Sequence, residues 1–211
     1  MLVLLLLGTM SVSLLTLLAP VSFRPLPLSA PVIVTALVFS LFVADLLYYW
    51  YHRAQHTFPL LWGIHELHHS DTQLNATTAM RTYWLEYPMQ IIVIATPVHL
   101  LFGVSPTLSF SHMLVAAFLL VFTHANVRLR LGVLTPVIVG PQLHRIHHSR
   151  LPEHQDKNFA QYFPVIDKMF GTYHAPHPNE FPPTGTPHLA TDAPLSQVLS
   201  RPFLHWWKRL N

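Results

Sequence analysis

Hydrophobic residues fall into four long blocks along the chain. They cover Met1–Ala19, Pro31–Tyr51, Tyr87–Val104 and Pro106–Phe122, and Asp45 is the only charged residue within them. Each block has about 17–21 residues, close to the ~20 that an α-helix needs to cross a bilayer. The first block has no basic residues before it, which favours a retained membrane helix over a signal peptide. The pattern predicts about four transmembrane helices.

The ends of these blocks predict the topology. The second block runs into "YWYHRAQH" and the fourth into "VFTHANVR", while the short turn "GVSP" joins the third and fourth. Both histidine-bearing ends should therefore lie on one side of the membrane. Nearly all Lys and Arg residues lie on that side, and only Arg24 lies on the other, which indicates the cytoplasm. We expect an all-α, multi-pass membrane protein, typical of a bacterial inner membrane, with a cytoplasmic histidine-rich helical cap.

Composition narrows the chemistry of this cap. The chain has 16 His and no Cys, so disulfides, iron–sulfur clusters and thiolate zinc sites are excluded. Its formal charge is only +3, and its basic residues form no run, so nothing points to nucleic acid.

Nine histidines have spacings typical of metal ligands. Pairs at i, i+4 and triplets at i, i+3, i+4 lie on one face of a helix, and one more histidine closes the fourth block; the nine are His52, His56, His65, His68, His69, His124, His144, His147 and His148. Nine imidazoles exceed the needs of one metal and suit two, with positions left open; all-nitrogen ligation suits zinc, copper, iron or nickel. The remaining histidines, including His154 and His174, lack a paired spacing and are not expected to bind metal.

Two acidic residues lie beside these clusters. Asp45 is two turns before His52, where it can accept a hydrogen bond from the second ring nitrogen of a ligand or pair with an arginine. Glu66 lies in "HELHH", which contains H-E-x-x-H and permits an alternative function as an intramembrane zinc metalloprotease. A protease does not explain the parallel "HRIHH" and "HRAQH". A non-catalytic membrane metal carrier is a further alternative, but it would favour polar residues along the spans.

Five motifs between Ala44 and Tyr173 resemble the fatty acid hydroxylase/sterol desaturase superfamily. They are "DLLYYWYHRAQH", "HELHHSDTQLNATTAMRTYWLE", "FTHANVR", "LHRIHHS" and "KNFAQYFPVIDKMFGTY". The resemblance implies a membrane non-haem di-iron enzyme that uses O2 to hydroxylate or desaturate a fatty acyl, sterol-like or isoprenoid lipid. It also implies that the nine histidines hold two Fe ions, with His124 as an additional ligand.

The resemblance departs from the family pattern in the last motif. The family usually has N-Y-G followed by W-D, whereas this chain has Asn158-Phe159-Ala160 and Ile166-Asp167. With Glu66 and Asp45, the polar residues Asn158 and Asp167 are candidates for supporting the ligands. We expect the catalytic domain to cover residues 31–173, after a membrane helix and loop at 1–30.

Partners follow from what the sequence contains. No G-x-G-x-x-G motif or haem module is visible, so an external ferredoxin, cytochrome or reductase should supply electrons. The lipid should enter from the bilayer past span residues such as Tyr49, Phe118 and Phe122. Residues 174–211 form a Pro-rich tail, in which "PFLHWWKRL" is typical of an interfacial anchor.

Overall fold

The computed structural model describes residues 29–102 and 106–210. Within these ranges the regular secondary structure is helical, and the only β-contact is an isolated bridge between Ser149 and Thr184. The all-α prediction is therefore confirmed for this part of the chain. The predicted first span, Met1–Ala19, and the centre of the predicted hairpin turn lie outside the described residues.

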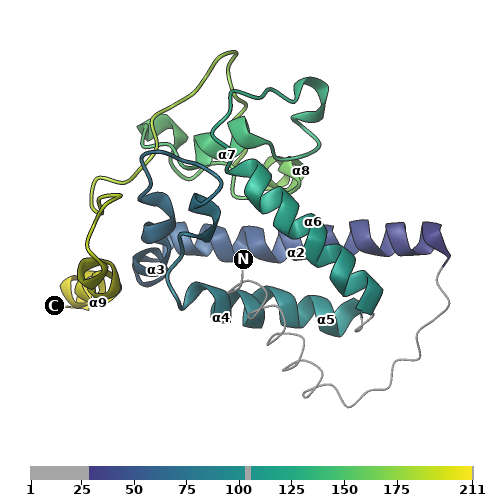
Figure 1. The fold of residues 1–211 in the computed structure, drawn as a ribbon, viewed down its shortest axis with the longest axis horizontal. Helices are drawn as coiled ribbons and strands as arrows, with labels where there is room; N and C mark the ends of the chain where they lie inside the picture. Colours follow the sequence, from purple (N-terminus) through teal and green to yellow (C-terminus); the bar gives the residue numbers. More distant parts are fainter. Residues whose placement is uncertain (1–28, 103–105, 211) are drawn as a thin grey trace.

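The longest helix is α2 (Ala30–Thr57), which runs across the molecule in Figure 1. Pro31 occupies its first turn, where the missing N–H costs nothing. The helix ends before Pro59, and Phe58 takes the extended conformation that a following proline favours. Helix α3 (Pro59–His69) begins at once. The chain therefore turns sharply after His56 and brings a second histidine-bearing helix back against the first.

Two further apolar segments pack against α2. The first is a nearly continuous helix made of α4 (Glu86–Gln90), a π-helical turn η2 (Ile91–Ala95) and α5 (Thr96–Phe102), and it lies along α2 in Figure 1. The second is α6 (Pro106–Thr123), which crosses α2. Large apolar side chains on α2, α5 and α6 are exposed, including Phe39, Leu100 and Phe118. Such surfaces on a single chain are typical of contact with lipid.

Length and composition identify one described helix, Pro31–Thr57, as able to cross a membrane. The apolar helices Glu86–Phe102 and Leu108–Thr123 are shorter. The expectation of four spans thus stays a prediction, with α2 as its best-supported member.

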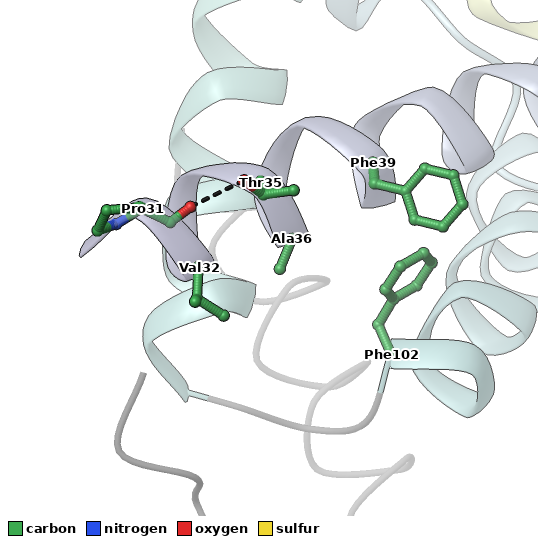
Figure 2. A pocket seen from close by; sticks show the side chains of 6 residues that line it. All are labelled: Pro31, Val32, Thr35, Ala36, Phe39 and Phe102. Carbon is green, nitrogen blue, oxygen red and sulfur yellow. Dashed lines mark hydrogen bonds between the residues drawn. The ribbon is translucent and has the colours of Figure 1, made fainter. Parts of the chain in front are cut away.

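An apolar crevice of about 430 Å³ lies between the start of α2 and the end of α5. Figure 2 shows the rings of Phe39 and Phe102 next to each other at one end of it. Their centroids are 5.6 Å apart. Phe39 precedes His52 by 13 residues, or roughly 20 Å along a helix. This crevice is therefore remote from the nine candidate ligand histidines and belongs to the apolar end of the helix bundle.

Short helices and loops form the cap over the C-terminal half of α2. They are η1 (Thr78–Met80), η3 (Gly132–Leu134), α7 (Pro141–His147), η4 (Pro152–His154) and α8 (Pro164–Met169). A buried cluster of Tyr49, Phe159, Ala160 and Ile166 joins α2 to the loop before α8. The cap is thus packed directly on the helix that carries the first two histidines.

The C-terminal helix α9 (Leu195–Leu210) packs against α3. Gly63 permits this close approach, because a Cβ at that position would lie 3.0 Å from Nε1 of Trp206. The same indole N–H donates a hydrogen bond to the carbonyl of Leu60, at 2.8 Å. The tail after residue 174 therefore ends on the helix that bears His65, His68 and His69.

Candidate metal centre

All nine predicted histidines converge in the cap, in two groups. In each group the candidate ligand atoms lie within 4.8 Å of one another. The first group contains His52, His56, His65, His69 and His147, and the second contains His68, His124, His144 and His148. Two groups of imidazoles can hold two metal ions.

The two spatial groups do not coincide with the clusters of histidines along the sequence. Helix α3 gives its i, i+4 pair, His65 and His69, to the first group and its i+3 residue, His68, to the second. Helix α7 does the reverse, since His147 joins the first group while His144 and His148 join the second. Each of these two helical segments therefore contributes to both groups.

The hydrogen bonds of the first group fix where its ring protons lie. Nδ1–H of His52 donates to the carbonyl of Phe159 at 2.8 Å, and Nδ1–H of His147 donates to the carbonyl of Lys157 at 2.9 Å. A carbonyl oxygen only accepts, so each Nε2 is left with a lone pair. Nδ1 of His65 lies 3.3 Å from a carboxylate oxygen of Glu86, which assigns its proton in the same way.

These assignments leave lone pairs facing one another. Nε2 of His52 lies 3.0 Å from Nε2 of His65, so their lone pairs face each other. The lone-pair nitrogen Nε2 of His147 also lies 3.2 Å from Nε2 of His69. Two lone pairs at such a distance repel unless a cation lies between them. Burial lowers the pKa of His69 and His147 well below the ordinary value, so a proton is disfavoured as that cation. The donor set of the first group therefore fits a metal ion.

The second group follows the same logic. Nδ1–H of His124 donates to the carbonyl of Leu120 at 2.7 Å, so its Nε2 carries a lone pair. That nitrogen lies 3.0 Å from Nε2 of His144 and 3.2 Å from Nε2 of His68. Burial lowers the pKa of His124 to about 4. Burial also lowers the pKa of His68, His144 and His148 well below the ordinary value. The four rings are thus neutral near pH 7, the form in which imidazole binds a metal.

Asp45 holds a loop rather than a histidine. Its carboxylate accepts hydrogen bonds from the backbone N–H groups of Gln161, Tyr162 and Phe163, at 2.7–2.9 Å. Neither a ligand histidine nor an arginine is its partner, which differs from both roles that the sequence suggested. The acid is fully buried because these three donors compensate its desolvation.

Asp167 holds the same loop from the other side. It accepts hydrogen bonds from the N–H groups of Phe159, at 2.7 Å, and Ala160, at 3.0 Å, and from the hydroxyl of Thr172. The carbonyl of Phe159 in turn accepts the ring proton of His52. Asp45 and Asp167 therefore support the first group through the backbone of residues 159–163.

Asn158 lies next to this loop with a positive φ of 56°. Its side chain accepts from the N–H of His174 and donates to the carbonyl of the same residue, at 2.8 and 3.1 Å. It therefore fixes the tail segment against the loop, one residue after the carbonyl that binds His147.

Glu66 is buried and faces α9. Its carboxylate forms a two-point ion pair with the guanidinium of Arg201, at 2.9 and 3.2 Å. It is absent from both groups of candidate ligand atoms. This ion pair thus attaches α9 to α3. Because the carboxylate of Glu66 is paired, it is not the free base that a zinc protease would need.

Two carboxylates that contact histidines of the nine-histidine set were not found by sequence analysis. Glu86 binds Nδ1 of His65 and also accepts from the side chain of Gln55. Asp156 lies 3.5 Å from Nδ1 of His56. Neither has a regular spacing from its histidine. Glu86 is, however, the last residue of the quoted motif "HELHHSDTQLNATTAMRTYWLE", and its place in that motif could have pointed to it.

Tyr49, one of the three suggested lining residues, lies in the interior of the cap. Its side chain is fully buried, and its hydroxyl lies 3.0 Å from that of Thr172. Phe118 is exposed, and its ring stacks on that of Phe122. Of the three suggested residues, Phe118 and Phe122 are thus the two that a lipid can reach.

Comparison with known proteins identifies relatives of this chain. The family model "Fatty acid hydroxylase" matches residues 37–172. The chain is 33% identical over 138 residues to an alkylglycerol monooxygenase of Caenorhabditis elegans, a match covering 65% of this chain and 27% of that protein. It is 32% identical over 139 residues to the ornithine lipid hydroxylase OlsE of Rhizobium tropici, covering 66% and 42% respectively.

The human alkylglycerol monooxygenase is 31% identical over 139 residues, covering 62% of this chain and 29% of that protein. The chain thus spans less than half the length of these relatives. No solved structure matches. The matched region contains all nine histidines, and the superfamily resemblance seen in the motifs is confirmed.

Acidification should destabilise the cap. Histidines of the unfolded chain protonate near pH 6.5, whereas burial lowers the pKa of His124 to about 4 and that of His147 further below its ordinary value. Between the pKa of the folded state and that of the unfolded state, the unfolded state binds more protons than the folded state. The free energy of unfolding therefore falls as the pH falls. Thermal unfolding of the metal-free protein in detergent should show a Tm that drops steadily from about pH 7 to pH 4.5. A constant Tm over this range would contradict the burial of neutral rings.

Proposed function

We propose, from the premise that the chain belongs to the fatty acid hydroxylase family, that it is a membrane-bound lipid hydroxylase that uses O2 and two non-haem irons. The observation that carries the proposal is the pair of imidazole groups in the interior, in each of which two Nε2 atoms lie 3.0 Å apart. Similarity to a monooxygenase and a hydroxylase of lipids supports hydroxylation over desaturation.

In this proposal the first group holds one iron and the second group holds the other. When bound, the irons supply the O2 chemistry that removes hydrogen from an unactivated C–H bond, a redox task that zinc cannot perform. The balanced reaction converts R–H, O2, two electrons and two protons into R–OH and water. An external ferredoxin, cytochrome or reductase provides the electrons.

The protein contributes position and tautomer. The carbonyls of Lys157, Phe159 and Leu120 hold the ring protons of their histidines on Nδ1, so that Nε2 is free to bind metal. Glu86 does the same for His65 and adds a negative charge beside the ring, which strengthens it as a ligand. Burial of the rings keeps water away from the reacting centre.

The substrate class we propose is a membrane lipid whose chain enters along the apolar helices. Phe118 is exposed on α6, within three helical turns of the cap. Phe122 follows one turn later on the same helix. The names of the relatives, an alkylglycerol monooxygenase and an ornithine lipid hydroxylase, both describe lipids with a polar head group. A lipid of that kind would keep its head at the membrane surface while its chain reaches the histidines.

The membrane arrangement we propose is multi-pass, with the cap on the cytoplasmic side. Helix α9 supports a position of the cap at the membrane surface, because it presents an exposed apolar stripe at every fourth position; the stripe consists of Leu195, Leu199, Phe203 and Trp207. Such a helix lies in the interface with its apolar side toward the lipid. The stripe agrees with the anchor expected from "PFLHWWKRL".

The proposed reaction is tested by isotope labelling. Full-length protein purified anaerobically from iron-replete cells should contain close to two irons per chain. With reductant and a mixture of membrane lipids under ¹⁸O2, mass spectrometry should detect a lipid product heavier by one ¹⁸O atom. One tightly held zinc without iron, and no labelled product, would refute the di-iron hydroxylase.

Substitutions distinguish the hydroxylase from a zinc protease. His68→Ala and His147→Ala should each abolish lipid oxidation and lower the iron content, because each removes a ligand. Glu66→Gln should keep substantial oxidation, with at most a ~10–100-fold loss if the residue supports a ligand indirectly. Arg201→Gln is the matched control and should behave like Glu66→Gln, since the two residues form one ion pair. An inactive Glu66→Gln beside an active His68→Ala would favour the protease.

Reporter fusions test the topology. A reporter after Ile146 and one at the C-terminus should both read as cytoplasmic, whereas one inserted at Ser105 should read as exoplasmic. This result requires the segments 86–102 and 106–123 to cross the membrane in opposite directions. If Ser105 and Ile146 report the same side, these two helices do not form a membrane hairpin and the cap lies elsewhere.

A further inference from the structure

A third group of ligand-type side chains lies outside the nine-histidine centre. His154, His174 and Glu180 bring one candidate ligand atom each to within 4.8 Å of one another. We propose that these three residues bind one divalent transition-metal ion of the zinc type, separate from the two ions of the nine-histidine centre. Sequence spacing gave no sign of this group, because its members are 6 to 26 residues apart and no common helix holds them.

The geometry of the group is that of converging ligands. Nε2 of His154 lies 3.0 Å from a carboxylate oxygen of Glu180, and the rings of His154 and His174 are 4.8 Å apart at 69°. His154 is almost fully buried. Nε2 of His174 is also buried and has no hydrogen-bond partner. A buried ring nitrogen without a partner is uncommon, and a metal bond would satisfy it.

The three residues are held in place by contacts that need no metal. Nδ1 of His154 is 2.9 Å from the hydroxyl of Ser149, the residue that forms the β-bridge with Thr184. The side chain of Asn158 clamps the backbone of His174. The second carboxylate oxygen of Glu180 accepts the N–H of His177 at 2.7 Å. The site is therefore organised before an ion arrives.

The donor set favours zinc or a similar ion. Two imidazoles and one carboxylate are common zinc ligands, and they leave the fourth tetrahedral position for water. Calcium and magnesium prefer sites made of oxygen. The alternative is a plain hydrogen bond between His154 and Glu180, with no affinity for metal.

A metal at this position would attach the tail to the cap. Its ligands come from η4 and from the irregular segment that leads toward α9. Lys157, whose carbonyl binds His147, lies between the ligands His154 and His174 in the chain. The ion would therefore stabilise the segment that orients one histidine of the first group.

The experiment uses full-length protein in detergent, loaded with iron anaerobically and then equilibrated with Zn²⁺ alone. Zinc and iron are counted by elemental analysis after dialysis. We expect close to one zinc per chain with no loss of iron, and a higher Tm in the presence of zinc. Glu180→Gln keeps the size of the side chain. Glu180→Gln and His174→Ala should each weaken zinc binding by more than about tenfold, while the iron content stays unchanged.

His188→Ala is the matched control, because His188 is exposed and belongs to none of the three groups. It should bind zinc and respond in Tm as the unaltered protein does. Zinc bound only in proportion to iron lost would overturn the proposal, since the ion would then occupy the nine-histidine centre. Equal zinc binding by the unaltered protein, Glu180→Gln and His174→Ala would also overturn it.

Discussion

The structure depends on packing nine imidazoles together in the interior, with ring nitrogens that converge in two groups. Burial lowers the pKa of rings such as His144 and His148 well below the ordinary value, but it does not decide which nitrogen of a neutral ring carries the proton. For His52, His147, His124 and His65 that choice is made by acceptors at Nδ1, namely three backbone carbonyls and the carboxylate of Glu86. Each acceptor must lie at a defined position. Much of the cap can be understood as the means of placing them.

The loop of residues 157–163 illustrates this dependence. It provides the carbonyls of Lys157 and Phe159 and has little regular structure of its own. Its conformation is fixed by Asp45 from α2 and Asp167 from α8, which together accept five backbone N–H groups. A carboxylate within an apolar helix, which is costly without partners, is thus explained by the loop that it holds.

Sequence analysis predicted the three long apolar helical segments of the described residues and the convergence of the nine histidines, because both depend on local spacing. A ring at i+4 lies near its neighbour whatever the tertiary fold. The same reasoning failed for Asp45, whose partners are more than 110 residues away. It also gave no sign that His154 and His174 lie close together, because no helix connects them. It also missed the division of "HELHH" between two groups. That division depends on how α3 faces α7, and such packing is not encoded in either segment alone.

The shared use of α3 and α7 has a consequence for how the centre is assembled. Each segment carries ligands for both groups, so neither group can be completed without positioning the other's residues. An ion bound in one group therefore lowers the entropy that remains to be lost when the second ion binds. If the two groups hold two ions as proposed, the ions are expected to load cooperatively, and a half-filled centre should be a minor species at intermediate metal concentrations. Iron limitation would then produce a mixture of empty and fully loaded molecules rather than a population with one ion each.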